Sequence, residues 1–284
     1  MKKVSRDIYV PNVKYIPKIE EVISWFQNVP MEIEECFFPK RLKKKFLSYY
    51  KEAGLLKSWK RNYFFRHFAI NFSIAVEFLF EKRKAKGIKI LDLGCGTGTQ
   101  SLLFALLGAN IVGIDLDVEA LEILMIRKMF YEKLSGRSLS IKIYNANALE
   151  FPYETERPFD GIYSLFAFNM MQPSGYLISK ISRAVSEDAR LAIQDGNRLS
   201  WVGRFLRKRK QRLSPCELYR ELGKNGWEVE NQRGCISIPF IFWKLIPNQL
   251  LQPIDATLSS SWFFAFSHLT LACFKRNCPD GLEV

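Results

Sequence analysis

The chain of 284 residues carries a net charge of +13, and 48% of its residues are hydrophobic, which excludes a disordered protein. No apolar run reaches the ~18 residues needed to cross a bilayer, and the basic residues after Met1 lead into no apolar stretch, so neither a transmembrane segment nor a signal peptide is expected. The six cysteines form no C-x-x-C pair, so we expect no metal site and a reduced, cytoplasmic environment.

Residues 1–86 are expected to form a helical extension, or cap, in front of the main domain. Pro11, Pro17 and Pro30 interrupt any long helix in the first 35 residues. From about residue 39 to residue 86, apolar side chains recur at helical spacing, which predicts two helices packed before the sheet begins.

From residue 87 onward, short apolar strands alternate with helices. The expected strands are Ile88–Leu91, Ile111–Ile114, Ser140–Tyr144, Gly161–Leu165, Arg190–Gln194, Trp227–Glu230 and Phe264–Lys275. The expected helices are Gln100–Leu107, Val118–Tyr131, Tyr176–Val185 and Pro215–Asn225. This alternation predicts an α/β fold, a doubly wound, mostly parallel seven-stranded sheet with helices on both faces, in one domain over 87–284. Residues 236–263 are apolar and rich in proline, and are expected to form an insertion or lid before the last strand.

A glycine-rich turn follows the first expected strand. Residues 92–98 read Asp-Leu-Gly-Cys-Gly-Thr-Gly, and their three glycines let the backbone come close to a ligand at the start of a helix. The spacing G-x-G-x-G differs from the G-x-G-x-x-G fingerprint of dinucleotide-binding folds, which disfavours a nicotinamide-dependent dehydrogenase. Cys95 needs only to be small in this turn, and we do not expect it to act as a nucleophile.

This segment resembles motif I of the class I (Rossmann-like) S-adenosylmethionine-dependent methyltransferases. The resemblance implies that the protein binds S-adenosyl-L-methionine and releases S-adenosyl-L-homocysteine. It also implies that Asp92 lies near the cationic methionine end of the cofactor. The backbone of the loop would wrap the cofactor at Gly94, Cys95, Gly96 and Gly98.

Further motifs extend the resemblance to about residue 195. The strand that ends in Asp115 resembles the next family signature, whose acidic residue accepts hydrogen bonds from the ribose hydroxyls, and a carboxylate suits a vicinal diol. Asn147-Ala148 stands where the family usually has Asp-Ala, close to the adenine. The stretch Phe159–Ser164 resembles the fourth family element, whose end leads to the methyl-transfer site. The implied cofactor contacts are therefore Asp115, Leu116, Asn147, Ala148 and Ser164.

Asp195 and His67 are the candidate catalytic residues. Asp195 follows the fifth expected strand, at the edge of the sheet where doubly wound folds bind ligands. His67 lies in the helix before the sheet, which in such folds often covers the cofactor, and a hydroxyl acceptor calls for a general base within hydrogen-bond reach. Each residue also has a structural interpretation, as a loop cap for Asp195 and as a packed histidine for His67.

The positive charge lies outside the expected cofactor domain. Residues 1–86 carry 19 basic and 9 acidic side chains, whereas residues 87–200 carry 11 and 13. Basic flanks suit an anionic partner or a membrane surface. The segment Arg204–Arg212 resembles an interfacial basic helix, and a solvated charged face is the alternative.

The sequence predicts an enzyme that transfers a methyl group from S-adenosyl-L-methionine to oxygen or nitrogen of a small-molecule or lipid-like acceptor, because the segments that flank the sheet are apolar and aromatic. An RNA or protein methyltransferase with basic flanking segments is one alternative, and a non-catalytic cofactor-binding module is another. Sequences of the type Asn/Asp-Pro-Pro-Tyr resemble those of methyltransferases that act on the exocyclic amines of nucleic acids. No such sequence follows the fourth expected strand, so a nucleic acid is the less favoured partner. The expected location is the cytoplasm, with a peripheral position at a membrane as a variant.

Overall fold

The computed structural model describes residues 8–12, 15–52, 58–81, 87–197, 199–200, 214–238, 242–260, 267 and 269–277. Its strands are β1 (Lys89–Leu93), β2 (Asn110–Asp115), β3 (Ile141–Asn145), β4 (Phe159–Leu165), β5 (Val185–Gly196), β6 (Trp227–Cys235) and β7 (Leu269–Arg276). Its α-helices are α1 (Ile19–Gln27), α2 (Val29–Glu35), α3 (Lys40–Glu52), α4 (Ser58–Phe80), α5 (Thr99–Leu106), α6 (Val118–Ser135), α7 (Ser174–Ser182), α9 (Pro215–Gly223), α10 (Phe242–Leu245) and α11 (Asn248–Ser260).

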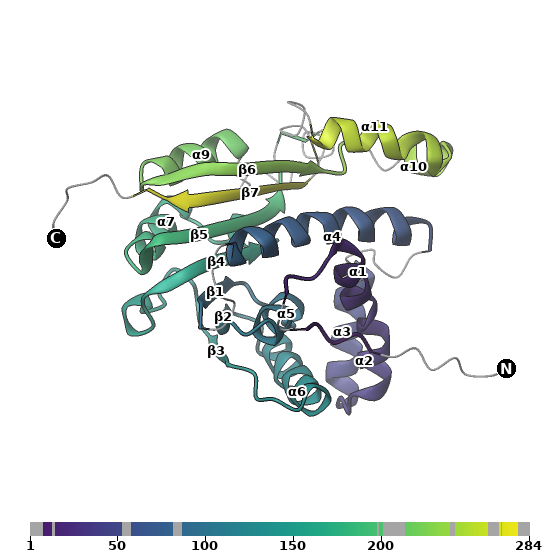
Figure 1. The fold of residues 1–284 in the computed structure, drawn as a ribbon, viewed down its shortest axis with the longest axis horizontal. Helices are drawn as coiled ribbons and strands as arrows, with labels where there is room; N and C mark the ends of the chain where they lie inside the picture. Colours follow the sequence, from purple (N-terminus) through teal and green to yellow (C-terminus); the bar gives the residue numbers. More distant parts are fainter. Residues whose placement is uncertain are drawn as a thin grey trace.

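The strands form one sheet in the order β3-β2-β1-β4-β5-β7-β6 (Figure 1). β7 runs antiparallel to both β5 and β6, and the other neighbouring strands pair in parallel. Successive strands are added on one side of β1 up to β3 and on its other side from β4 onward. The carboxyl ends of the parallel strands β1 and β4 therefore flank the point where the strand order reverses, which is where folds of this kind bind ligands. The predicted doubly wound, mostly parallel seven-stranded sheet is confirmed.

Helices cover both faces of the sheet, each over its own apolar core. On one face, side chains of α1, α4 and α5 pack against alternate residues of β1, β2, β4, β5 and β7. On the other face, α7 and α9 pack against the intervening residues of the same strands. In Figure 1 the long helix α4 lies along the sheet, while α10 and α11 lie beyond the end of β6. The expected helices on both faces are therefore present.

Helices α2 and α3 dock onto α6 and not directly onto the sheet. Buried residues of α2 and α3, among them Ile33, Leu42 and Phe46, form a small core with Ile123 of α6. Pro30 lies in the first turn of α2, where its missing N–H costs no helical hydrogen bond. α2 and α3 thereby stand beside the glycine-rich turn, which directly precedes α5.

Two element boundaries differ from the predictions for reasons of tertiary pairing. Val185 begins β5 and does not end the preceding helix, because it pairs with Phe159 of β4. β6 continues to Cys235, five residues past the expected Glu230, because its register with β7 extends to Leu269. The side chains of β6 are mostly polar and exposed, so a search for apolar runs predicts the start of this strand but not its continuation past Glu230.

The expected insertion at 236–263 contains helices α10 and α11 in its described part. Asp255 of α11 is fully buried, and its Oδ1 accepts a hydrogen bond from the backbone N–H of Ile238 at 2.7 Å, which fixes α11 to the end of β6. The basic segment Arg204–Arg212 and the first residues of the expected last strand, 264–266, lie outside the described residues. Within the described part of the chain, no helix is long and apolar enough to cross a membrane.

Candidate active site

The turn after β1 holds its backbone close to β2. The N–H of Gly94 donates to the carbonyl of Ile114 at 2.8 Å, and the N–H of Gly96 donates to Oδ2 of Asp115 at 2.7 Å. Gly94 has a φ of +74°, and a Cβ at this position would lie 2.2 Å from the Cβ of Ala167. Only glycine fits this backbone conformation and this close approach.

Asp92 lies buried beneath the turn, near the end of β1. Its Oδ2 accepts a hydrogen bond from the hydroxyl of Ser101 on α5. Burial raises the pKa of Asp92 to about 7, against the opposing effect of the Ser101 hydrogen bond and with a smaller contribution from the charge of Asp115. A carboxyl group with such a pKa gains from a cationic ligand, which would stabilise its ionised form.

Asp115 ends β2 and faces the same turn. Its Oδ1 accepts from the backbone N–H of Asp117 at 2.8 Å, in addition to the Gly96 contact at Oδ2. The Asn145 amide donates to the carbonyls of Asp115 and Leu116 at 3.1 and 3.0 Å, which fixes the bend after β2. Since each carboxylate oxygen accepts about two hydrogen bonds, Asp115 keeps acceptor capacity for a ligand.

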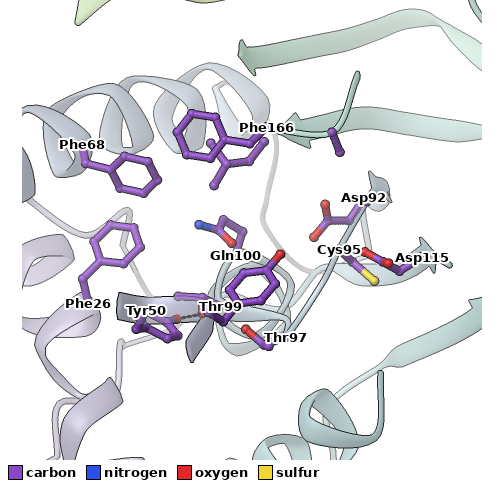
Figure 2. A pocket seen from close by; sticks show the side chains of 14 residues that line it. Phe26, Tyr50, Phe68, Asp92, Cys95, Thr97, Thr99, Gln100, Asp115 and Phe166 are labelled. Carbon is purple, nitrogen blue, oxygen red and sulfur yellow. Dashed lines mark hydrogen bonds between the residues drawn. The ribbon is translucent and has the colours of Figure 1, made fainter. Parts of the chain in front are cut away.

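A cavity of about 170 Å³ opens between the turn and the first helices. Its lining comes from the N-terminal helices, from the turn and α5, and from the segment after β4: Phe26, Tyr49, Tyr50, Phe68, Asp92, Gly94, Cys95, Thr97, Thr99, Gln100, Asp115, Leu165, Phe166 and Ala167. Figure 2 shows Asp92 and Asp115 on one side of this pocket and the rings of Phe26 and Phe68 on the other. The pocket therefore has an acidic end and an aromatic end.

Three phenylalanines from three elements make the aromatic end. Phe68 of α4 meets Phe26 of α1 edge to face at 5.2 Å between ring centroids, and it stacks on Phe166 at 5.9 Å. Phe166 has a φ of +57°, a conformation that costs about 1–2 kcal/mol for a residue with a side chain. Strain of this kind persists where the surrounding structure holds it, often at ligand sites.

Tyr49 of α3 covers the acidic end. Its hydroxyl lies 2.7 Å from the point that a Cβ on Gly96 would occupy. Burial, followed by the nearby charge of Asp115, raises the pKa of Tyr49 to about 12, so the phenol stays protonated at neutral pH. Tyr49 can therefore donate a hydrogen bond at this end of the pocket.

Four of the residues predicted to contact the cofactor line the pocket: Asp92, Gly94, Cys95 and Asp115. Gly96 and Gly98 lie in the same turn, and a Cβ on Gly98 would clash with Leu124 at 2.3 Å. Burial, with the charge of Asp92, raises the pKa of the Cys95 thiol well above its usual range, so Cys95 is a protonated packing residue at neutral pH.

The remaining predicted cofactor contacts lie outside the pocket lining. Leu116 is 70% exposed next to Asp115, and Ala148 is buried in the core. The side-chain oxygen of Asn147 accepts from the N–H of Leu149 at 3.0 Å, and the hydroxyl of Ser164 donates to the carbonyl of Leu93 at 2.9 Å. Each of these polar groups has a structural use here, and their contacts with the cofactor stay predictions.

The two candidate catalytic residues are buried and do not line the pocket. Asp195 Oδ2 accepts from the N–H of Asn169 at 2.8 Å, and its Oδ1 accepts from the N–H of Gly196 at 2.6 Å. His67 Nε2 lies 3.8 Å from Oδ2 of Asp255, and burial lowers the pKa of His67 to about 4 despite the opposing charge of that carboxylate. The imidazole is therefore neutral at pH 7, and both catalytic roles stay predictions.

Sequence reasoning missed the residues that the N-terminal helices and the segment after β4 bring to the pocket. Tyr49 and Tyr50 fall on the helical periodicity of residues 39–86, which predicts packing, and no sequence motif includes Phe26. The signal for Phe166 was its position directly after a buried central strand, at the edge where Asp92 and Asp115 also lie. The contacts of Phe26 and Tyr49 are with residues distant in sequence, and only the fold reveals them.

The strand order is that of the fold which the glycine-rich turn predicted from its resemblance to class I methyltransferases. Residues 65–239, more than half of the chain, match the family model described as a methyltransferase domain. The chain belongs to this family and is an S-adenosylmethionine-dependent methyltransferase.

Known relatives agree with this assignment. The chain is 27% identical, over 176 residues, to a ubiquinone biosynthesis O-methyltransferase of Rhizobium etli, covering 57% of this chain and 69% of that protein. Its fold is similar to that of magnesium protoporphyrin IX methyltransferase from Synechocystis PCC 6803, solved with bound SAH, with a TM-score of 0.54 and 13% identity over 81% of this chain and 95% of the other. A methyltransferase from Mesorhizobium loti has a TM-score of 0.52 and 15% identity over 72% and 98% of the two chains.

Proposed function

We propose that the protein transfers the methyl group of S-adenosyl-L-methionine to an oxygen atom of a small, flat, apolar acceptor. The observation that carries this proposal is the division of one pocket into an acidic end, with Asp92 and Asp115, and an aromatic end, with Phe26, Phe68 and Phe166. The first end suits a cationic, hydroxylated cofactor, and the second suits a ring that stacks between aromatic side chains.

The residues at the acidic end fit the cofactor. Gly94 lines the pocket, where its backbone can contact a ligand, and the buried carboxyl of Asp92 suits the cationic methionine end. Asp115 has acceptor capacity left for the two ribose hydroxyls, and the exposed apolar side chain of Leu116 beside it suits an adenine ring. When bound, S-adenosyl-L-methionine supplies an electrophilic methyl group on a cationic sulfur.

The protein's own contribution is orientation and the exclusion of water. Phe68 and Phe166 form an apolar wall that holds an acceptor ring in one plane, and Tyr49 covers the opposite end of the pocket. Holding two reactants in line supplies a large part of the rate enhancement of such transfers. Hydroxyl groups on a flat acceptor would point from the aromatic end toward the acidic end.

The name of the Rhizobium etli relative supports oxygen as the acceptor atom. Its identity of 27% over part of the chain supports the reaction class more strongly than the particular acceptor. The proposed acceptor is a hydroxylated aromatic ring with an apolar surface.

The experiment is a methyl-transfer assay with labelled S-adenosyl-L-methionine and catechol as the test acceptor. We expect O-methylated catechol by mass spectrometry, and no labelled product from total RNA at low salt. Phe68→Ala is expected to raise the KM for catechol about tenfold and to leave the affinity for S-adenosyl-L-homocysteine unchanged, because the ring lies at the aromatic end. Labelled RNA without labelled catechol would contradict the proposal.

We also propose a cytoplasmic location with the face around α3 turned toward anionic lipid. Phe37, which is 94% exposed, precedes a helix that carries the exposed Lys40 and Lys44. An apolar side chain flanked by cations is typical of interfacial binding. Co-sedimentation with phosphatidylglycerol vesicles, compared with phosphatidylcholine vesicles, tests this proposal, and Phe37→Ser with Lys44→Glu should remove the difference.

A further inference from the structure

Two carboxamide side chains are fully buried between α4 and the sheet. Asn71 of α4 and Gln194 of β5 both have an exposed fraction of 0%. All four polar atoms of these side chains lack a hydrogen-bond partner among the described residues. An unpaired buried donor or acceptor destabilises the folded state, so two such amides point to a ligand that pairs with them.

Contacts along α4 place Asn71 above the carboxyl end of β4. Phe72 of α4 meets Tyr163 of β4 at 5.7 Å between ring centroids, and Phe68 stacks on Phe166, just past β4, at 5.9 Å. α4 therefore runs opposite to β4. Asn71, between Phe72 and Phe68 in the helix, lies at the level of the strand residues that follow Tyr163.

Gln194 lies at the same level on the neighbouring strand. It is in register with Leu165 of β4, and in-register neighbours on parallel strands point to the same face of the sheet. Leu165 packs into the core beneath α4 and also lines the pocket. Gln194 therefore lies beside a residue that lines the pocket. The hydroxyl of Tyr163, two residues before Leu165 on β4, is likewise without a partner among the described residues.

The charged groups around this cluster determine which ligand it would accept. His67, one turn before Asn71, is neutral at pH 7 because burial lowers its pKa to about 4. Asp255 of α11 lies 3.8 Å from His67, and the charges of Arg233 and Arg66 also act on His67. The charge of Asp92 acts on Tyr163 of the same cluster. No cation of the described residues is paired with either amide, so a neutral group is favoured over a carboxylate.

We propose that Asn71 and Gln194 form a subsite for an uncharged polar substituent of the acceptor, such as a carboxamide. This inference rests on the proposed function, because it extends the aromatic end of the pocket beyond Leu165. A carboxamide both donates and accepts hydrogen bonds, as do the two side chains. The subsite would select acceptors by a group distant from the methylated oxygen.

The test compares three compounds with a common ring: catechol, 3,4-dihydroxybenzamide and 3,4-dihydroxybenzoate. Calorimetry measures their binding to the full chain saturated with S-adenosyl-L-homocysteine. We expect the benzamide to bind at least about tenfold more tightly than catechol, and the benzoate no more tightly than catechol. This comparison needs no variant. Equal binding of catechol and the benzamide, or a preference for the benzoate, would overturn the subsite.

Variants locate the effect. Two variants, Gln194→Leu and Asn71→Leu, should each remove the advantage of the benzamide over catechol. Each should leave the affinity for S-adenosyl-L-homocysteine within twofold, because leucine has a similar shape and the substitution is distant from the acidic end of the pocket. Gln232→Leu, an exposed amide on β6, is the matched control and should keep the advantage. An advantage that survives both buried substitutions would show that the amides bind only water or each other.

A parallel methyl-transfer assay separates the two proposals. Methylation of catechol without a benzamide advantage would overturn the subsite alone. A benzamide advantage in binding without methylation of either compound would overturn the proposed acceptor and leave the subsite standing. Binding of neither compound would overturn both.

Discussion

Arg127 of α6 and Glu32 of α2 form an ion pair with no exposed surface on either side chain. Arg127 Nε donates to Glu32 Oε2 at 2.5 Å, and its Nη2 donates to Oε1 at 3.1 Å. The same guanidinium donates to the carbonyl of Thr97 at 2.6 Å and to the hydroxyl of Thr99 at 2.9 Å. One side chain thus connects the first helices to the turn that follows β1.

Two aromatic side chains add hydrogen bonds at and beside the pair. The hydroxyl of Tyr131 donates to Glu32 Oε1 at 2.6 Å, and the indole of Trp25 donates to the carbonyl of Thr99 at 3.0 Å. Additional hydrogen bonds to its members help a buried ion pair to be tolerated. The shape of the glycine-rich turn after β1 therefore depends on residues of α1 and α2.

We predict that loss of one partner of this pair destabilises the protein and weakens cofactor binding together. Arg127→Met or Glu32→Leu leaves an uncompensated buried charge and should reduce the free energy of unfolding by about 3–5 kcal/mol in urea titrations. The double replacement should cost less than the sum of the two. The control is Arg41→Ala, which breaks an exposed pair with Glu119 and should change the stability by less than ~1 kcal/mol. Additive effects of the two buried substitutions would contradict the coupling.

We predict that binding of S-adenosyl-L-methionine strengthens as the pH rises through 7. The pKa of Asp92 is about 7 without ligand, and a cationic ligand favours the ionised form, so binding releases a proton near neutral pH. Calorimetry at pH 7 in buffers of different ionisation enthalpy measures this release, which Asp92→Asn should abolish. Identical affinities at pH 6 and pH 8 would contradict the assigned role of Asp92.

The same raised pKa has a consequence for the stability of the ligand-free protein. The folded-state pKa of Asp92 lies above its value in the unfolded chain, so the folded state loses stability as the pH rises from about 4 to 7. Asp92→Asn should therefore stabilise the ligand-free protein by about 1–3 kcal/mol at pH 8 and have little effect at pH 4. Thermal unfolding at the two pH values measures the difference, and a substitution that destabilises equally at both would refute this explanation.

We predict that Asp115→Ala and Gly96→Val each weaken binding of S-adenosyl-L-homocysteine, by about 1–3 kcal/mol or more. The first removes the acceptor for the N–H of Gly96, and the second forces a Cβ against the hydroxyl of Tyr49 at a φ of +51°. Titration calorimetry of the parent and both variants measures the loss. The control is Asp160→Asn. Asp160 lies at the amino end of β4, whereas Asp92 and Asp115 lie at the carboxyl ends of β1 and β2. Equal affinity in all of these proteins would remove the cofactor assignment.

We predict that Phe166→Gly yields a more stable protein than Phe166→Ala. Phe166 has a φ of +57°, where glycine is unstrained and alanine is not, so the difference should be about 1 kcal/mol in favour of glycine. Both variants lose the ring that stacks on Phe68, and both should raise the KM for an aromatic acceptor. Urea unfolding gives the stability difference, and the opposite order would show that the backbone relaxes when the ring is removed.

The sheet and the acidic end of the pocket were predictable from the sequence because their signals are local. A strand, a glycine turn and an acidic strand end occur in order along the chain, and Asp92, Gly94 and Asp115 follow from that order. The aromatic end was not predictable, since Phe26 and Phe68 meet only after the helices fold back over the sheet. The orphaned amides of Asn71 and Gln194 could not be found either, because a polar residue in an apolar pattern does not reveal whether it has a partner.

The methyltransferase family model begins at residue 65, whereas Phe26, Tyr49 and Tyr50, which line the pocket, precede it. The part of the molecule common to the family thus supplies most of the acidic end of the pocket, and the preceding helices supply much of the rest of the wall. In evolutionary terms, mutations in α1 and α3 could change the accepted compound while the glycine turn stayed intact. Selectivity and catalysis would then evolve under separate constraints. Arg127 links the two parts, because its buried guanidinium donates to Glu32 of α2 and to the carbonyl of Thr97 in the glycine turn.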